Sequence, residues 1–592
     1  MNFRKSILLI LTLFFIGYLA NINNPNRVIQ PSDLNTYAIK ISASYNSVDY
    51  LIITTEEFKS ILQPLAEWKT QKGVVSKIEL VSNILAEYSG VTESEKIKNC
   101  IKYYYNNNNT QWVLLAGDIN HVPTQSIFVD DGFPYDGDYV SCDSYYGDIN
   151  NNWVSNDFDY NAEVYVGRLT ANNQNEMENL VENILNYEKN PPIGAWMSHA
   201  LFAGSILQFD QDWNDDGNKD YGECDANRLN NFINDTLVPK NWTSIFLAQT
   251  QGIKGSDNHS DLQLNYNNLQ NEINKGCSIG LISAHGSPQS MSIEEWKEDY
   301  DGDMLFDYTD DPFEGDGVPI DEGEWTNLMS TSYMNFHPQD DKLGVFFLGS
   351  CSVGTFEDIN DCIAEYFLKN TAIGCVAASK VVWGEDQWYE RDHGGWFMEG
   401  LGFRFWEQLL QHNQPGKALA LAKADYVADR IISPEPREYP EWGNKTLKQY
   451  NLLGDPEVPI WLSIPKQLNV SIDQPFNNIT NTMTLKVKSN EVPVKNVTIT
   501  YTVNNTLLFK ESTNENGTIE VPFSDIEVDD YIFTAYKRGF LPFQANLPED
   551  GSSLTGDRIP GYNLSIIIFI TINFIGVASI YLKRSLSKKK TH

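Results

Sequence analysis

The sequence predicts an α/β domain with a mostly parallel sheet flanked by helices, then a β-sandwich and a C-terminal transmembrane helix. Three observations lead to this prediction. Short apolar runs alternate with helical patterns from residue 49 to 462, which is typical of a parallel sheet with helices on both faces. After Pro465 the pattern changes to short alternating segments separated by turn residues. Residues 564–582 form an apolar run just long enough to span a membrane.

The α/β domain begins after an Asn-rich linker at residues 21–48. We expect strands at 50–54, 74–80, 111–118, 163–166, 200–204 and 373–378, and helices at 56–72 and 175–189. A chain of 592 residues is too long for one core, so about three domains plus tails are expected.

Two further strands each end in a reactive residue. Residues 278–286 end in His285-Gly286, and residues 343–351 end in Cys351. Ligands of open α/β sheets bind at the carboxyl ends of the strands, so neighbouring strands would bring His285 and Cys351 together there. An imidazole beside a thiol can produce the attacking thiolate. The pair therefore indicates nucleophilic acyl transfer, most simply peptide hydrolysis.

The remaining segments complete the domain prediction. Residues 466–548 are expected to form a sandwich of immunoglobulin size, with strands near 484–488, 497–503 and 531–536. Residues 549–563, rich in Gly, Ser, Pro and Asp, are expected to form a stalk. The apolar run at 7–20 follows Arg4 and Lys5 and predicts a signal peptide or N-terminal anchor within residues 1–20.

Charge predicts which side of the membrane the domains occupy. Residues 583–592 are basic, which predicts a cytoplasmic tail after the helix and a single-pass protein with its catalytic domain outside the cell. The net charge of −36 argues against nucleic-acid binding and suits calcium sites. The seven cysteines are an odd number, which outside the cell leaves at least one thiol free, and Cys351 is the candidate.

With these elements placed, the chain resembles the gingipain-type cysteine peptidases, a branch of the caspase-like fold. The resemblance runs from about residue 49 to 461 and rests on the order of its pieces as well as on the pieces themselves. They are Asp49-Tyr-Leu-Ile-Ile-Thr54, Pro64-Leu-Ala-Glu-Trp-Lys69 with Lys72-Gly73, Leu114-Leu-Ala-Gly-Asp118, Asp143-Ser-Tyr-Tyr146, Val166-Gly-Arg168, Ala284-His-Gly-Ser287, Cys351 with Gly354, Phe356 and Cys362, Trp383-Gly-Glu-Asp386, and Leu453-Gly-Asp-Pro456.

The resemblance implies roles for the residues that match. His285 is the implied base and Cys351 the nucleophile, with the backbone N–H groups of Gly286 and Cys351 as the oxyanion hole. Many members have an acid that orients the histidine just after the strand that corresponds to residues 200–204. This chain has Ser205-Ile206 there, so we expect either Asp210 to take that role or a Cys–His dyad.

The same resemblance suggests how substrates are chosen. Asp386 matches the aspartate that meets the substrate ammonium group in the lysine-specific gingipain, with Trp383 as a wall of the pocket. An exposed loop acid is the alternative interpretation of Asp386. Ser283, at the end of its strand, is assigned to the substrate-binding set as well. The segment between His285 and Cys351 is longer than in gingipains and holds an acidic insertion at 299–324.

Two acidic segments predict structural calcium, and no organic cofactor is expected. Residues 212–223 fit the calcium loop of an EF-hand, with Gly217 at position 6. Its candidate ligands are Asp212, Asn214, Asp216, Asn218, Asp220 and Glu223. A looser candidate site consists of Asp299, Asp301, Asp303 and Asp307.

Together these features predict a membrane-anchored extracellular cysteine endopeptidase that acts on proteins or peptides and cleaves after Lys or Arg. The alternative is a catalytically inert or latent surface adhesin or processing factor, stabilised by calcium, on the same scaffold. The fold alone does not decide between them.

Overall fold

The computed structural model describes residues 47–130, 139–151, 160–211, 218–219, 221–300, 302–307, 322–358, 360–385, 395–432, 440–477, 482–503, 505–522 and 531–546. All of them belong to one compact unit, Ser44–His592. The predicted signal or anchor at 1–20, the stalk at 549–563 and the apolar run at 564–582 lie outside the described residues. Among the helices that are described, none has the length and apolar character needed to cross a membrane.

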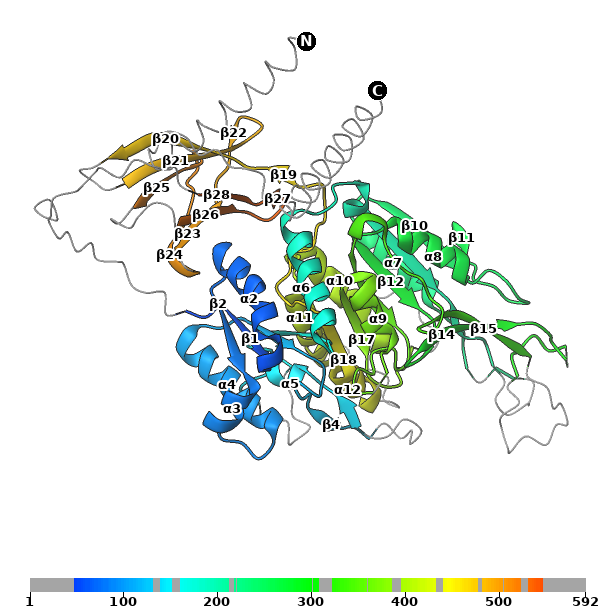
Figure 1. The fold of residues 1–592 in the computed structure, drawn as a ribbon. Helices are drawn as coiled ribbons and strands as arrows, with labels where there is room; N and C mark the ends of the chain where they lie inside the picture. The colour runs from blue at the N-terminus through cyan, green and yellow to red at the C-terminus, as the bar shows by residue number, and fades with distance from the viewer. Residues whose placement is uncertain are drawn as a thin grey trace, which may run out of the picture. The chain divides into compact units, whose positions relative to one another are not determined.

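A mixed sheet of eleven strands forms the centre of the described α/β domain (Figure 1). In spatial order its strands are β11 (Leu262–Gln263), β10 (Thr243–Ala248), β7 (His199–Gly204), β12 (Ile279–Ser283), β16 (Gly344–Gly349), β17 (Ala372–Ala378), β18 (Tyr450–Gly454), β6 (Tyr165–Leu169), β3 (Trp112–Ala116), β1 (Tyr50–Thr54) and β2 (Ser76–Leu80). The prediction of a mostly parallel sheet is confirmed.

The sheet consists of two parallel halves that run in opposite directions. β17 and β18 pair antiparallel, with Ala378 opposite Tyr450, whereas the strand pairs within each half are parallel. The carboxyl ends of β7, β12 and β16 therefore lie at the edge opposite to the carboxyl ends of β1, β3 and β6. The Gly117-Asp118 motif after β3 is thus separated from the edge that carries His285 and Cys351.

The helices form two groups, with the sheet between them (Figure 1). α2 (Glu56–Gln71), α6 (Gln174–Lys189) and α9 (Ile363–Asn370) pack together, as do α7 (Ala226–Thr236), α10 (Phe397–His412), α11 (Pro415–Ile432) and α12 (Pro440–Gln449). In α6, Asn173 caps the first turn by accepting the Glu176 N–H, and the buried residues Met177, Leu180, Val181 and Ile184 recur at helical spacing.

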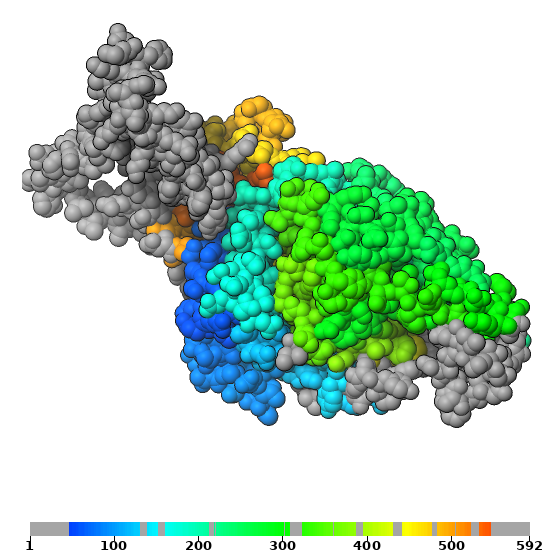
Figure 2. Space-filling model, turned by 45° about the vertical axis from the view of Figure 1, so that its right-hand side comes forward, coloured from blue at the N-terminus to red at the C-terminus, as the bar shows by residue number. Residues whose placement is uncertain are grey.

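Shorter elements complete the α/β domain. They are α3 (Val81–Glu87), α4 (Glu93–Asn108), α5 (Ser144–Gly147), α8 (Tyr266–Lys275), the 3-10 turns η3 (Ala195–Ser198) and η4 (Gln339–Asp341), the pair β4 (Ser126–Phe128) and β5 (Tyr139–Ser141), the pair β8 (Ile206–Gln208) and β9 (Cys224–Asp225), and the three-stranded sheet β13 (His285–Ser287), β14 (Ser290–Trp296) and β15 (Gly323–Ser330). The β14–β15 hairpin projects from the sheet in Figure 1 and forms surface at the right-hand end of Figure 2.

The C-terminal strands form the predicted β-sandwich. One sheet holds β20 (Asn469–Asn477), β21 (Thr482–Ser489), β22 (Val492–Pro493) and β25 (Thr518–Pro522), and the other holds β24 (Thr506–Ser512), β23 (Thr498–Val503), β26 (Tyr531–Tyr536) and β28 (Phe543–Asn546), with a small pair of β19 (Lys466–Gln467) and β27 (Phe540–Leu541). The two sheets share an apolar core of their own, which includes Leu485, Val497, Ile499 and Phe533.

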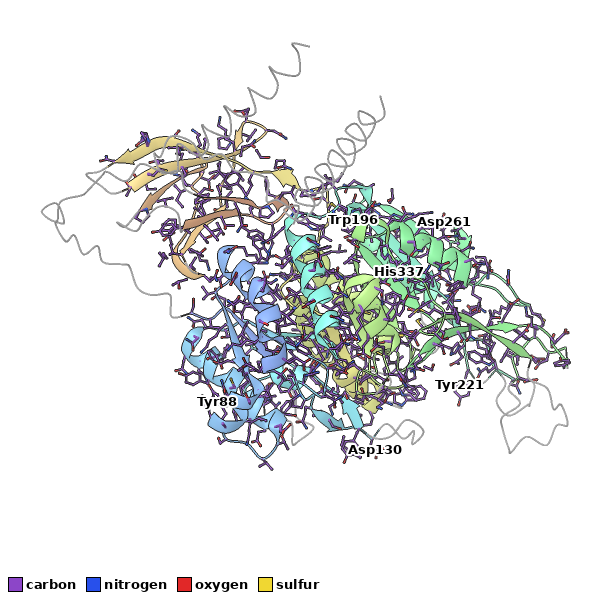
Figure 3. The ribbon with its side chains drawn as sticks, in the orientation of Figure 1. Tyr88, Asp130, Trp196, Tyr221, Asp261 and His337 are labelled. Carbon is purple, nitrogen blue, oxygen red and sulfur yellow. The ribbon has the colours of Figure 1, made fainter. Side chains whose placement is uncertain are left out.

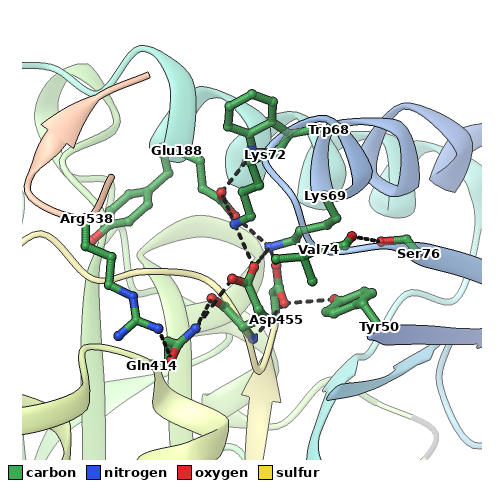
Figure 4. Close-up of polar contacts among 12 residues, drawn as sticks. Tyr50, Trp68, Lys69, Lys72, Val74, Ser76, Glu188, Gln414, Asp455 and Arg538 are labelled. Atoms are coloured by element: carbon green, nitrogen blue, oxygen red, sulfur yellow. Dashed lines mark hydrogen bonds and ion pairs between the residues drawn. The ribbon is translucent and has the colours of Figure 1, made fainter. Parts of the chain in front are cut away.

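A buried ion cluster joins several of the motifs that carry the family resemblance (Figure 4). The ammonium group of Lys69 lies 2.6 Å from Glu188, 2.5 Å from Asp455 and 2.7 Å from Glu457, and Lys72 pairs with Glu188 and Glu457. All five side chains are almost fully buried. Each charge has opposite charges beside it, as a buried ion requires, so these motif residues hold α2, α6 and the segment after β18 together.

A second buried pair joins two further motifs. Arg168 on β6 donates to both carboxylate oxygens of Asp143, at 2.6 and 2.8 Å, and also to the carbonyl oxygens of Gly117 and Val122. Such bidentate pairing fixes the loops around β6. The motif residues in both clusters are therefore structural.

Candidate active site

The register of two neighbouring strands places His285 and Cys351 at the same edge of the sheet. β12 pairs in parallel with β16, and Ser283, the last residue of β12, lies opposite Gly349, the last residue of β16. His285 and Cys351 each follow two residues later. Both strands are buried throughout, as predicted for the middle of a parallel sheet.

The two loops that follow these strands are in direct contact. The backbone N–H of Ala284 donates to the hydroxyl oxygen of Ser350 at 3.3 Å. Gly286 fits closely against the other loop: a β-carbon at this position would lie 2.5 Å from the carbonyl oxygen of Cys351 and 2.9 Å from the Cβ of Ser350. Only a glycine allows the backbone of residue 286 to approach the nucleophile this closely.

Cys351 begins a tight turn that is anchored on both sides. Ser352 adopts a φ of 57°, a left-handed conformation that is uncommon for residues other than glycine. Its N–H donates to the carbonyl of Lys380 at 3.0 Å, and the Thr355 hydroxyl donates to the carbonyl of Ser379 at 2.8 Å. These bonds hold the start of the turn, so the thiol of Cys351 has a defined place at the sheet edge.

Cys351 is half-buried, whereas the other six cysteines are buried. Burial raises the pKa of the Cys100 and Cys277 thiols to about 12 and also raises the pKa of Cys375. A thiol with such a pKa forms almost no thiolate near neutral pH. The exposure therefore supports Cys351 as the reactive cysteine.

His285 lies in an apolar setting. Its imidazole meets the indole of Trp325 edge to face, with ring centroids 4.8 Å apart and an interplanar angle of 76°. Desolvation lowers the pKa of His285 to about 4. The ring is therefore neutral at neutral pH and able to accept a proton.

Among the described residues, no carboxylate makes an ion pair or hydrogen bond with His285, and Asp210 in particular has other partners. Its carboxylate accepts from Lys254 at 2.6 Å and from the Glu223 N–H at 2.8 Å, and it also pairs with Lys219. Hydrogen bonds from the two lysines are the main cause of its lowered pKa. The prediction that Asp210 orients His285 is therefore wrong in this structure.

The predicted substrate residues have different positions. The Cys351 thiol donates to the carbonyl of Val382 at 3.5 Å, which places the 382–385 segment beside the nucleophile. Trp383 in this segment is half-buried and stacks on Trp442, with ring centroids 4.3 Å apart. Asp386 lies outside the described residues. Ser283 is 1% exposed, a burial that argues against direct contact between its side chain and a substrate.

Two buried carboxylates belong to this region: Glu385, which lies in the quoted motif but had no predicted role, and Glu399 on α10, which was not predicted. Glu385 and Glu399 are each 2% exposed, and the Glu385 N–H donates to the carboxylate of Glu399 at 3.2 Å. Burial, with the nearby Glu385 carboxylate, raises the pKa of Glu399 to about 8, and the Cys224 thiol donates to it at 3.5 Å. No local motif distinguishes Glu399, because only the fold brings α10 under residues 382–385.

Only part of the first predicted calcium loop is described. Residues 212–217 and 220 lie outside the described residues, whereas Asn218 is exposed and Glu223 pairs with Arg228 at 2.8 Å and with Lys254 at 2.9 Å. Two backbone hydrogen bonds between Gln211 and Tyr221 bring the two ends of this segment together (Tyr221 is labelled in Figure 3). Strands β8 and β9 flank this segment, in place of the helices of an EF-hand. Arg228 and Lys254 already neutralise the carboxylate of Glu223. Calcium binding by this segment stays a prediction.

The second acidic segment is held by its own backbone. Asp299 accepts the Gly302 N–H at 2.9 Å, Asp303 accepts the Leu305 N–H at 2.7 Å, and Glu322 accepts the Tyr300 N–H at 2.7 Å. Asp301 lies outside the described residues. In the described part of the chain, the one group of acids close enough to share a metal ion is Glu188, Asp455 and Glu457, and Lys69 and Lys72 already neutralise it.

Comparisons with known proteins identify the fold and the family of the chain. The fold of the chain is similar to a crystal structure of the Arg-specific cysteine proteinase gingipain R (TM-score 0.58, 14% identity, 85% of this chain and 98% of that one). It is also similar to a complex of the pro- and mature domains of RgpB from Porphyromonas gingivalis (0.58, 14%, 84% and 99%) and to a structure described as a protease (0.59, 17%, 85% and 97%). No curated protein matches the chain.

The family model "Peptidase family C25" matches residues 43–461, which is more than half of the chain. This span includes the whole α/β domain and both loops that carry His285 and Cys351. The chain belongs to peptidase family C25 and is a cysteine endopeptidase.

Proposed function

We propose that the chain hydrolyses peptide bonds with a Cys351–His285 dyad and cleaves after Lys or Arg, outside the cell and anchored to the membrane. The parallel register of β12 and β16 carries the dyad part of the proposal, because it places the two residues at one sheet edge. The close fit of Gly286 against Cys351 is the second support, because it keeps the backbone of residue 286 beside the nucleophile.

In the proposed mechanism His285 acts first as a base and then as an acid. The neutral imidazole removes the thiol proton of Cys351, and the thiolate attacks the substrate carbonyl carbon. The N–H groups of Gly286 and Cys351 stabilise the oxyanion, a contribution of about 3–4 kcal/mol per donor. The imidazolium protonates the leaving amine as the C–N bond breaks. A water molecule, deprotonated by His285, then hydrolyses the thioester and restores the thiol.

The preference for a cationic side chain rests on acids near the 382–385 segment. Asp386 is the proposed partner of the substrate ammonium or guanidinium group, and Trp383 the wall beside it. The buried acid Glu399 supports this proposal, since a cation bound beside the same segment would favour its ionised form over the protonated form that burial favours.

Calcium and the membrane anchor are secondary parts of the proposal. Calcium is proposed as a structural ion of the 212–223 segment, with side-chain oxygens as ligands and no part in the chemical step. The anchor is proposed to be residues 564–582, on the strength of their apolar sequence and the basic residues that follow.

One observation favours the inert alternative. His285 has no carboxylate partner among the described residues, and many peptidases use such a partner to fix the imidazole. A dyad without a third group is nevertheless sufficient when other contacts hold the ring in place.

The test is hydrolysis of fluorogenic peptides that end in Lys, Arg or Ala before the reporter group. The full chain is assayed with calcium and reductant, beside Cys351→Ala, with Cys277→Ala as the matched control because its thiol is buried. The proposal expects Lys or Arg cleavage that is lost in Cys351→Ala and kept in Cys277→Ala. If a folded wild-type chain cleaves none of the peptides, the inert alternative is favoured.

A further inference from the structure

Trp325 and His285 lie on the same face of the three-stranded sheet β13–β14–β15. His285 lies opposite Ser292 on β14, and Ser292 lies opposite Asn327 on β15. The Ser292 hydroxyl donates to the Asn327 side-chain oxygen at 2.9 Å, so these two side chains share one face. Trp325 is two residues from Asn327, and residues two apart in a strand point the same way.

The small side chain of Ser292 lets the indole reach across β14. The two rings belong to strands that are not neighbours, yet their centroids are 4.8 Å apart. A larger side chain at position 292 would stand between them. The edge-to-face angle of 76° is a favoured arrangement of aromatic rings and restricts rotation of the imidazole about its own axis.

Trp325 is also 51% exposed, which is unusual for a tryptophan that has only a structural role. Its neighbours on β15, Glu324 and Thr326, are exposed as well, so this part of the strand contributes little buried surface. One part of the indole covers His285, and the rest is open to solvent beside it.

We propose that Trp325 positions His285, a role that a carboxylate usually has. We also propose that the exposed face of the Trp325 indole binds the substrate residue after the scissile bond. The proposal rests on the proposed function and deepens it. His285 must reach the leaving amine, so the chain that leaves passes on the His285 side of the site. An indole surface there favours an aromatic or large apolar side chain over glycine or aspartate.

The main experiment follows kcat/KM against pH from 4 to 9 for the full chain and for Trp325→Ala and Trp325→Phe. Removing the indole hydrates His285, so its pKa rises from about 4 towards the ordinary 6.5. Since the base must be neutral, the acid limb of the profile moves to higher pH. Trp325→Ala should then lose about tenfold or more of its kcat/KM at pH 5 and less at pH 8. Trp325→Phe should recover most of the loss.

The second measurement uses internally quenched peptides that differ only in the residue after the scissile bond. Wild type should prefer Phe over Gly by about tenfold, and Trp325→Ala should reduce this preference to about twofold or less. Tyr333→Ala is the matched control, because Tyr333 is 46% exposed and packs on Tyr266, not on His285. Ser292→Gln is the second variant: it keeps Trp325, separates the two rings with a polar side chain and should reproduce the shift of the acid limb.

Failure of this proposal is distinct from failure of the proposed function. Alkylation of Cys351 by iodoacetamide, measured against pH, reports the dyad without any substrate, and the other six thiols are buried. If wild type cleaves no peptide but Trp325→Ala still shifts the alkylation profile, the positioning role holds and the peptidase proposal fails. A pH profile and a Phe/Gly preference that are unchanged in both folded Trp325 variants would overturn the inference.

Discussion

Replacing Gly286 by alanine tests the contact on which the catalytic assignment depends. The new β-carbon would lie 2.5 Å from the Cys351 carbonyl oxygen, 2.9 Å from the Ser350 Cβ and 2.9 Å from the Val353 Cγ1. Ordinary contact begins at about 3.4 Å, so the two loops must separate by about 0.9 Å. Two of the three obstacles belong to the nucleophile turn, which is held by bonds to Lys380 and Ser379 and cannot yield easily.

The expected effect is large on catalysis and moderate on stability. A displacement of about 1 Å in a catalytic group lowers the rate by about 10²-fold, and loss of an oxyanion donor lowers it by about 10²–10³-fold. We therefore expect kcat/KM to fall by about 10²-fold or more. Forced overpacking of this kind costs about 1–3 kcal/mol of the free energy of unfolding.

The assay compares kcat/KM for a Lys peptide, and chemical denaturation, in wild type, Gly286→Ala and Gly374→Ala. Gly374 on β17 is the control, because a β-carbon there would have its closest neighbour at 3.7 Å. That variant should keep wild-type activity. If Gly286→Ala folds and retains kcat/KM within about threefold, the oxyanion role of Gly286 and the reasoning from close contact are both refuted.

Three further predictions concern groups around the site and in the core. Asp210→Asn should leave the pH profile of kcat/KM unchanged, because Asp210 pairs with lysines and not with His285; a shift of the acid limb would restore Asp210 as the orienting acid. Glu399 keeps its proton to about pH 8 in the folded state but loses it near pH 4.5 in the unfolded state. Its contribution to the free energy of unfolding is therefore complete below pH 4.5 and is lost as the pH rises to 8. Glu399→Gln should therefore flatten the decline in unfolding free energy between pH 5 and 8, and an unchanged slope would contradict the raised pKa. Lys69→Met leaves Glu188 and Asp455 without their shared cation and should cost about 3–5 kcal/mol by denaturation, whereas Lys77→Met, in a partly exposed pair, should cost about 1 kcal/mol or less.

The sequence predicts most of the fold because the fold depends on local patterns, and these patterns together with the order of the family motifs indicate the two candidate catalytic residues. The apolar runs before His285 and Cys351 indicate buried parallel strands, and residues that follow such strands necessarily meet at one edge once the strands are neighbours. The reversal between β17 and β18 has no such signal, because strand direction is set by distant packing. Sequence proximity suggested Asp210 as the orienting acid, but Lys254, 44 residues away, takes its carboxylate. Trp325 was missed because it reaches His285 from a strand 40 residues along the chain, and Glu399 because no local motif marks the contact that α10 makes with Glu385.

The buried charges of the family motifs and the contact that holds His285 are under different physical constraints, and this difference bears on the proposed dyad. Lys69, Asp455, Arg168 and Asp143 are buried charges paired with each other or with carbonyl groups, and loss of one partner would leave an uncompensated charge in the core. These positions are therefore fixed by the fold. The partner of His285 is under no such constraint, because a half-buried neutral imidazole needs only a contact that limits its rotation and its hydration. The aromatic edge of Trp325 on β15 meets both needs, and desolvation of the ring lowers its pKa to about 4, so the base stays neutral well below neutral pH. A carboxylate would instead raise the pKa of the imidazole. A peptidase that has Trp325 where others have this acid should therefore stay active at lower pH than a triad enzyme.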